Sequence, residues 1–253
     1  MLNYDYQLKS FGNNINVAVV GASGGIGLSL VEELSLNLCV NKIFALSRSK
    51  FIHSGDNVST FHLDLENEGI IASAASAVSK VANELTVLFV TSGILHSGNT
   101  LSPEKTWKSI NSQTIEKVFK INTIGPALVA KHFLPLISTN KKCALVFLTA
   151  RMGSIGDNFL GGWYSYRASK AGLNMIIKTL SIEMARRNAN SVCVGLHPGT
   201  VDTKLSQPYQ RGVKPGSLFS GKQSAKYLLQ VLNSLSPKNT GSIFSWDGDE
   251  IPY

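Results

Sequence analysis

Short apolar runs of strand length recur along the chain, separated by longer segments in which polar and apolar residues are mixed. The runs are almost continuously hydrophobic, which is typical of strands that are covered on both faces in a parallel sheet. They predict strands over residues 16–20, 42–46, 60–63, 86–90, 143–149, 191–197 and 242–246.

The longer segments predict helices over residues 25–37, 67–83, 104–120, 122–137, 165–188 and 221–235. Regular alternation of strand and helix predicts an α/β fold, a Rossmann-type doubly wound parallel sheet of about seven strands with helices on both faces. No repeat or low-complexity linker interrupts the pattern, so we predict a single domain over residues 1–253. Residues 201–220 are rich in Gly, Pro and Ser, and we expect them to form a substrate loop.

Composition and charge limit the classes of partner. The chain is 43% hydrophobic and 16% charged, as in globular proteins. Its net charge of +8 comes from 24 Lys and Arg spread along the sequence, so we expect no nucleic-acid partner. A basic surface also suits a polyanionic cofactor. No apolar run approaches the roughly 20 residues that span a bilayer, and the first residues lack a signal-peptide pattern, so we expect no membrane partner and a cytoplasmic location.

The cysteines do not suggest a disulfide framework. Cys39, Cys143 and Cys193 are single, and two of them lie in apolar runs. Isolated cysteines in such surroundings are typical of small buried hydrophobic residues. We therefore predict neither disulfides nor a metal site.

A glycine-rich turn follows the first predicted strand, in VVGASGGIGLSLVEEL. A strand that leads through such a turn into a helix presents free N–H groups and the positive helix end to a diphosphate. Gly21 allows the tight turn, Gly25 the approach of the phosphates and Gly27 close helix packing. Such turns are sometimes only structural, but the context of a parallel sheet favours a dinucleotide. The predicted contacts are Gly21, Ser23, Gly24, Gly25, Ile26 and Gly27.

The ends of the next two predicted strands bear on the choice of dinucleotide. An NAD site usually has an acidic residue after the second strand, whereas this sequence reads ALSRSK. Arg48, with Ser47 and Lys50, supplies donors and positive charge for a 2′-phosphate, which favours NADP(H) over NAD(H). The alternative is a solvated loop charge. Asp64 and Leu65 are candidate adenine contacts, although Asp64 also suits a helix cap.

The stretch WYSYRASKAG, residues 163–172, places two tyrosines ahead of a lysine. Tyr166 and Lys170 are four residues apart and share one helix face, while Tyr164 lies off that register. A free tyrosine, with a pKa of roughly 10, is a poor proton donor at neutral pH, and a nearby lysine cation stabilises the phenolate. The pair is a candidate for acid/base chemistry; the alternative is a core tyrosine beside a lysine that reaches solvent.

Five motifs then occur in order: GASGGIG at 21–27, SGIL at 92–95, KINTIGP at 120–126, YSYRASK at 164–170 and HPGTVDT at 197–203. With these motifs the chain resembles the short-chain dehydrogenase/reductase family along nearly its whole length. The segments GILH, RMGSIGDN and WDGDEIPY are similar to the branch that contains C-factor-like proteins and the sniffer-type carbonyl reductases.

The resemblance implies an oxidoreductase that transfers a hydride between NADP(H) and a small carbonyl or alcohol substrate. It implies that Tyr166 is the acid/base, that Lys170 lowers the pKa of Tyr166 and binds the nicotinamide ribose, and that Asn122 holds a water linked to the lysine. It also implies a homodimer or homotetramer through the helices at 104–120 and 165–188. Further cofactor contacts that it implies are Ser92, Gly93, Pro198, Gly199, Val201 and Thr203.

Two positions depart from the family pattern. The serine that usually bonds the substrate oxygen, three residues before Gly153, is replaced by Ala150. Ser154 is our candidate substitute and Thr149 the second; a hydroxyl bonded only to backbone is the alternative for either. Thr91 stands where the family usually has an asparagine that braces the sheet, and we expect it to keep one side-chain hydrogen bond.

Two functions are therefore open. One is an NADP-dependent carbonyl reductase, and the other is a dinucleotide-binding signalling or regulatory protein with little turnover, which Ala150 favours. Tyr166, Lys170 and Asn122 favour the enzyme, because a protein that only binds the dinucleotide needs no proton relay.

Overall fold

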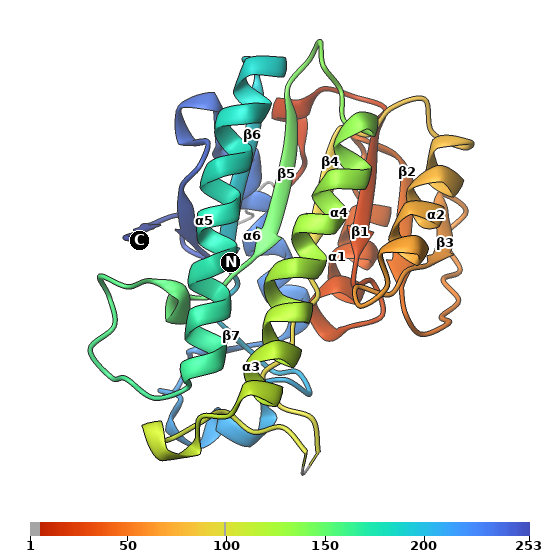
Figure 1. The fold of residues 1–253 in the computed structure, drawn as a ribbon. Helices are drawn as coiled ribbons and strands as arrows, with labels where there is room; N and C mark the ends of the chain where they lie inside the picture. Colours follow the sequence, from red (N-terminus) through yellow and green to blue (C-terminus); the bar gives the residue numbers. More distant parts are fainter. Residues whose placement is uncertain (1–5, 99) are drawn as a thin grey trace.

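A computed structural model describes residues 6–98 and 100–253 and confirms the doubly wound α/β fold (Figure 1). The main sheet has the order β10-β9-β6-β5-β4-β1-β2-β3. Its strands pair in parallel except for β10, which is antiparallel to β9. They are β1 (Ile15–Val20), β2 (Val40–Ser47), β3 (Val58–His62), β4 (Val87–Val90), β5 (Cys143–Leu148), β6 (Ser191–His197), β9 (Ile243–Ser245) and β10 (Glu250–Ile251).

Each of the seven predicted strands is present within two residues of its predicted ends. The prediction worked because central parallel strands need continuous apolar sequence, and β4, β5 and nearly all of β6 are indeed buried along their lengths. The additional strand of the main sheet is β10, a two-residue segment that is too short to leave a hydrophobic pattern.

Helices cover both faces of the sheet (Figure 1). Helices α1 and α6 share one apolar core with alternate residues of the central strands, and α2, α4 and α5 share the other. None of the described helices is long and apolar enough to cross a membrane. The helices are α1 (Gly25–Ser35), α2 (Glu68–Ser79), α3 (Ser112–Phe119), α4 (Gly125–Phe133), α5 (Tyr164–Arg187) and α6 (Gly221–Ser234).

The predicted helix at 104–120 is wrong in its first part. The α-helix begins only at Ser112, where the Asn111 side chain accepts from the N–H of Thr114 at 2.9 Å and caps the first turn. Upstream, residues 107–109 form one 3₁₀ turn, and Thr106 before it is extended. The predicted break before the next helix is also absent, because a π-helical segment, Lys120–Ile124, joins α3 to α4.

Residues 201–220 are more regular than a loop. Strand β7 (Thr200–Val201) pairs in parallel with β8 (Leu218–Phe219), so the start and end of this segment lie together. A 3₁₀ helix, Gln207–Gly212, lies between them. The two ends of the segment are therefore paired. Leu205 and Tyr209, in its middle part, pack against the cluster that contains Tyr166.

The brace expected from Thr91 is present. Its hydroxyl donates to the carbonyl of Val20 at 2.8 Å, and its N–H donates to the same oxygen at 2.8 Å. These bonds join the carboxyl ends of β4 and β1. The connections leave this pair of strands toward opposite sides of the sheet, and ligands of doubly wound folds bind at that point.

Candidate active site

The glycine turn lies against the ends of β4 and of the β6–β7 connection. Gly21 has a φ of +91°, and a Cβ there would come within 2.5 Å of Ser92 Oγ. A Cβ on Gly25 would come within 2.5 Å of Thr203 Cγ2. Three segments that are far apart in sequence therefore meet here, and neither Gly21 nor Gly25 has room for a side chain.

The amino end of α1 fits a diphosphate. Gly24 is the N-cap and supplies no side-chain hydrogen bond, and the first turn has no acidic residue. The first N–H groups of a helix lack intrahelical partners and carry positive partial charge, so they suit an anion. Ser23, Gly24 and Gly25 are exposed at this turn, Ile26 is half-buried, and Gly27 is buried against the carbonyl of Gly21.

The end of β2 presents the exposed guanidinium of Arg48. The Arg48 side chain is 68% exposed and lies 3.7 Å from Glu66 Oε2, while the other oxygen of Glu66 is 2.5 Å from Lys117 Nζ. Lys117 shares the charge of Glu66, so Arg48 is only loosely held. Ser47 is buried, and its hydroxyl donates to the carbonyl of Ser49 at 2.6 Å, so this hydroxyl is already used within the loop.

Asp64 and Leu65, the candidate adenine contacts, follow β3, and Asp64 is not the helix cap that was its alternative role. Asp64 Oδ1 accepts from the N–H of Glu66 at 3.0 Å. The cap of α2 is instead Asn67, whose side chain accepts from Ile70. Leu65 is buried, and a Cβ on Gly125 would come within 2.7 Å of its Cβ, so β3 and the start of α4 pack closely here.

Tyr166 and Lys170 lie on the first two turns of α5, 8% and 3% exposed. Lys170 Nζ is 6.0 Å from the centroid of the Tyr166 ring and donates to the carbonyl of Leu148, at the end of β5, at 2.9 Å. Burial raises the pKa of Tyr166 to about 12 and lowers the pKa of Lys170 to about 8. We expected the lysine to lower the pKa of Tyr166, but the shift is upward, because burial disfavours the charged phenolate.

Asn122 joins two parts of the site. Its Oδ1 accepts from the N–H of Ile94 at 2.7 Å, and its Nδ2 donates to the carbonyl of Ile94 at 2.9 Å and to Ser169 Oγ at 3.1 Å. It lies in the π-helical segment, a distortion that is often found at functional sites. A Cβ on Gly93 would lie 3.5 Å from Asn122 Oδ1 and 3.6 Å from Lys170 Nζ, so Asn122 and Lys170 face the same small space.

The two candidate substitutes for the hydroxyl expected at position 150 differ in their hydrogen bonds. Ala150 is buried in one apolar cluster with Tyr166 and Leu95. The Thr149 hydroxyl donates to Asn174 Oδ1 at 2.7 Å, so it is used inside the core. Ser154 is 2% exposed, and its Oγ accepts from the N–H of Asp157 at 3.0 Å, a bond that leaves its own hydrogen for another acceptor.

An apolar and aromatic wall surrounds the tyrosine. Trp163 packs edge-on against Tyr166 at 6.2 Å and against Tyr209 at 4.9 Å between ring centroids. His96 adds an edge contact to Tyr209 at 5.8 Å. Sequence analysis gave no role to His96, although it lies in the motif GILH. The half-buried members of this cluster are Met152, Trp163, Leu205 and Tyr209.

The HPGTVDT segment forms the remaining side. Gly199 has a φ of +77°, and a Cβ there would come within 2.6 Å of the Phe219 ring, so the turn needs glycine. The carbonyl of Pro198 accepts from Ser224 Oγ at 3.0 Å, which ties the turn to α6. Val201 is buried in β7. Thr203 packs against the glycine turn at Gly25, so this segment lies beside the turn, and its cofactor contacts stay a prediction.

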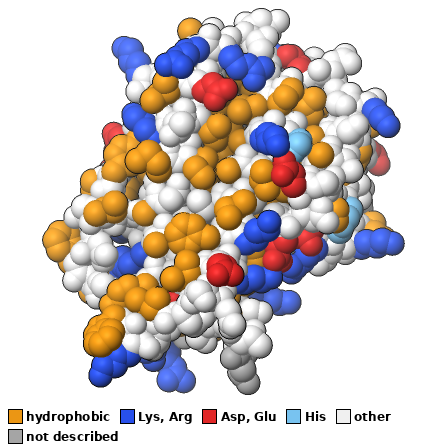
Figure 2. Space-filling view, in the orientation of Figure 1, with side chains coloured by type: hydrophobic (Ala, Val, Ile, Leu, Met, Phe, Trp, Pro, Cys, Tyr) orange, Lys and Arg blue, Asp and Glu red, His pale blue; other side chains and the backbone are white. Residues whose placement is uncertain are grey.

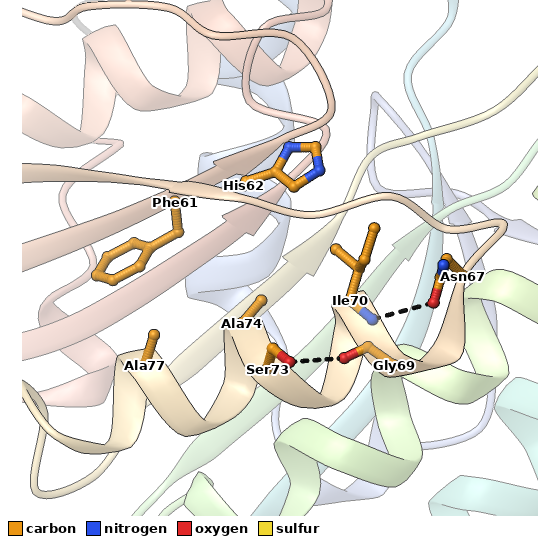
Figure 3. Close-up of a pocket in the computed structure, with 8 residues that line it drawn as sticks. All are labelled: Phe61, His62, Asn67, Gly69, Ile70, Ser73, Ala74 and Ala77. Atoms are coloured by element: carbon orange, nitrogen blue, oxygen red, sulfur yellow. Dashed lines mark hydrogen bonds between the residues drawn. The ribbon is translucent and has the colours of Figure 1, made fainter.

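A cavity of about 360 Å³ lies elsewhere, between β3 and α2 (Figure 3). Its polar side chains are mostly committed: Asn67 accepts from the N–H of Ile70, and Ser73 donates to the carbonyl of Gly69 at 2.8 Å. None of the candidate residues lines it, so its size alone does not make it the site. Its lining is Phe61, His62, Asn67, Gly69, Ile70, Ser73, Ala74 and Ala77.

Comparison with known proteins agrees with this geometry. The family model of short chain dehydrogenases matches residues 16–214. An uncharacterized oxidoreductase of Schizosaccharomyces pombe is 33% identical, over 93% of this chain and 96% of that protein.

Two solved structures share the fold. The NADPH-bound carbonyl reductase from chicken fatty liver is 26% identical with a TM-score of 0.82, covering 98% of both chains. The carbonyl reductase Sniffer of Drosophila melanogaster is 25% identical with a TM-score of 0.81, covering 95% of this chain and all of that one. These matches confirm the resemblance to sniffer-type carbonyl reductases, and the chain belongs to the short-chain dehydrogenase family of oxidoreductases.

Proposed function

We propose that this protein is an NADP-dependent carbonyl reductase in which Tyr166 is the acid/base. The observation that carries the proposal is the buried pair of Tyr166 and Lys170 at the carboxyl edge of the sheet, beside the dinucleotide cradle. The carbonyl reductase from chicken fatty liver, which binds NADPH, supports the same assignment by similarity. A bound reduced nicotinamide supplies the hydride, and the protein supplies position and a proton.

The proton comes from Tyr166. Burial raises its pKa to about 12, so this phenol keeps its proton at neutral pH, and donation to a carbonyl oxygen requires that the phenolate which forms is stabilised. The phenolate left behind is stabilised by the Lys170 ammonium, and the attraction is strong because both groups are shielded from water. Asn122 holds the neighbouring backbone and Ser169 in place, and Ser154 is the proposed second donor to the substrate oxygen.

The wall around Tyr166 favours an apolar substrate. Leu95, Met152, Leu205 and the rings of Trp163 and Tyr209 bring hydrocarbon close to the tyrosine, and Ala150 adds none of the usual polarity. We therefore propose small carbonyl compounds with an apolar or aromatic group beside the C=O as the substrates, and the corresponding alcohols for the reverse reaction.

The exposed Arg48 supports NADP(H) rather than NAD(H). A guanidinium forms paired hydrogen bonds with phosphate, and the weak contact of Arg48 with Glu66 leaves it free to turn. We also propose that the protein is cytoplasmic; its free cysteines, all three of them buried, are in keeping with a reducing compartment.

A homodimer or homotetramer is the proposed assembly. Hydrophobic side chains gather on the face formed by α3, α4 and α5 (Figure 2). Exposed apolar surface of this extent is typical of interfaces. The exposed hydrophobic residues on these helices and on the turns before them are between 38% and 67% exposed. They include Trp107, Ile110, Ile124, Tyr164, Met175 and Ile182.

The first prediction concerns the proton donor. Replacing Tyr166 by Phe removes the hydroxyl and keeps the ring that packs against Trp163, so kcat is expected to fall by about 100-fold or more. NADPH oxidation with a panel of aromatic aldehydes and ketones measures it, and fluorescence titration checks that NADPH still binds.

Tyr164→Phe is the matched control, because Tyr164 is on the same turn and 38% exposed; its rate should be that of the wild type. Equal negligible rates for wild type and Tyr166→Phe, with NADPH bound by both, would sink the reductase proposal and favour the dinucleotide-binding signalling protein.

The second prediction concerns cofactor choice. Arg48→Gln removes the charged partner of the 2′-phosphate, so the KM for NADPH should rise by about tenfold or more while the KM for NADH changes little. Steady-state kinetics with both cofactors measure the two constants. Arg186→Gln, at the far end of α5, is the control and should change neither. Equal effects of Arg48→Gln on both cofactors would count against a 2′-phosphate contact.

The third prediction is a pH profile. With the pKa of Lys170 near 8 and that of Tyr166 near 12, the ammonium is lost above about pH 8 while the phenol stays protonated. For carbonyl reduction, kcat/KM should be level below pH 8 and fall about tenfold per pH unit above it. Lys170→Arg, which stays charged, should remove this fall. A wild-type rate that stays level to pH 10 would contradict the role given to the lysine.

The fourth prediction concerns assembly. Light scattering should give two or four times the chain mass of 27.3 kDa. Met175→Glu, which places a charge on the exposed face of α5, should shift the protein toward one chain, because burying an unpaired charge is costly. Leu38→Glu, which places a charge at another exposed position, between α1 and β2, should not. A wild type with the mass of one chain at micromolar concentration would refute the assembly.

A further inference from the structure

Helix α5 begins in an uncommon backbone conformation. Gly161, Gly162 and Trp163 have φ angles of +62°, +66° and +53°. Trp163 is the N-cap of the helix and makes no side-chain capping bond. The left-handed region is unfavourable for a bulky residue, and such residues persist only where the surroundings hold them. The start of the helix that carries Tyr166 therefore depends on contacts from elsewhere in the chain.

Glu104 supplies those contacts from 61 residues upstream of Ser165. Its backbone carbonyl accepts from the N–H of Trp163 at 2.5 Å. Its carboxylate accepts from the N–H of Ser165 at 3.1 Å, and its second oxygen accepts from the Ser165 hydroxyl. Glu104 is only 3% exposed. A buried carboxylate at the amino end of a helix accepts hydrogen bonds from free N–H groups and interacts favourably with the positive end of the helix dipole.

These bonds fix the two residues next to the chemistry. Ser165 directly precedes Tyr166 in the helix, so its anchoring sets the height and rotation of the first turn. Trp163 packs edge-on against both Tyr166 and Tyr209, so its anchoring sets the aromatic wall. Arg167 adds support, because its Nε donates to the carbonyls of Gly161 and Gly162 at 3.2 and 3.0 Å.

The segment that ends at Glu104 is itself tied to the site. Ile94 is held by the Asn122 side chain. His96 Nε2 lies 3.0 Å from the carbonyl of Lys204, in the substrate loop. Residues 94–98 and 100–104 thus contact the π-helical segment, the substrate loop and the start of α5, and Glu104 makes the last of these contacts.

We propose that Glu104 is a positioning residue for the reaction: its carboxylate and carbonyl hold the first turn of α5 so that the Tyr166 hydroxyl and the Trp163 ring keep the geometry that proton transfer requires. The proposal rests on the role proposed above for Tyr166. A plain helix cap makes a different prediction, because its loss lowers stability and leaves the turnover of the folded protein unchanged.

The test compares Glu104→Ala, Glu104→Gln and the control Glu183→Gln, an exposed acid on the same helix, in the full-length protein. Glutamine keeps an acceptor for the Ser165 N–H and a donor for its hydroxyl, and alanine keeps neither. The measurements are kcat and KM for an aromatic aldehyde, the Kd for NADPH by fluorescence, and the melting temperature.

For Glu104→Ala, kcat should fall by about tenfold or more, because small displacements of reacting groups are costly. The Kd for NADPH should stay within about twofold of the wild-type value, since the cradle is on other elements. Glu104→Gln should recover most of kcat, and Glu183→Gln should match the wild type. Wild-type kcat in Glu104→Ala with a lower melting temperature would overturn the proposal, as would a glutamine variant as slow as the alanine variant.

Two further measurements keep the test decisive. If Glu104→Ala does not fold, Ser165→Ala removes only the hydroxyl contact, and its kcat should fall by about threefold with an unchanged Kd for NADPH; no fall would overturn the proposal. Tyr166→Phe is assayed alongside. An active Tyr166→Phe shows that the proposed function has failed, whereas an inactive Tyr166→Phe with a wild-type rate in Glu104→Ala overturns the positioning role alone.

Discussion

The first two turns of α5 are hydrogen-bonded to three other parts of the chain, and the placement of the polar groups at the site follows from these bonds. Glu104 holds Ser165, Asn122 bonds Ser169, and Lys170 reaches the carbonyl of Leu148 at the end of β5. A helix is rigid over this length, so fixing its start fixes Tyr166 as well. The sheet beneath is a rigid support for these bonds, because β4 and β5 are fully buried.

Burial sets the electrostatics of the same turns. It favours the neutral form of each group, which raises the pKa of Tyr166 to about 12 and lowers the pKa of Lys170 to about 8. The phenol is therefore protonated at neutral pH but is a weaker acid than a free tyrosine, while the pKa of the lysine lies close to neutral pH. The shielding that disfavours charge also strengthens the attraction between an ammonium and a phenolate when both form, so one environment serves both halves of a proton transfer.

Local patterns in the sequence predicted the strands, the glycine turn and the shared face of Tyr166 and Lys170, because each depends on neighbouring residues. Other features depend on contacts between distant segments. Residues 104–106 read as helix, yet Glu104 is used at α5 and the helix starts only at Ser112. The direction of the Tyr166 pKa shift was wrong for a similar reason. The spacing of two residues shows which helix face they share, but it does not show how deeply they are buried, and burial sets the direction of this shift. Thr149 was a candidate donor to the substrate oxygen, but its hydroxyl donates to Asn174 inside the core.

The most direct test of the central claim is the fate of the hydride. NADPH that carries deuterium at C4 of the nicotinamide is incubated with wild-type protein and an aromatic aldehyde or ketone, and the alcohol is examined by mass spectrometry and NMR. The account predicts one deuterium at the carbinol carbon for each cofactor oxidised when the label is on the transferred face, with the hydroxyl proton coming from water through Tyr166. Cofactor that binds but transfers no label to any carbonyl tested would contradict it.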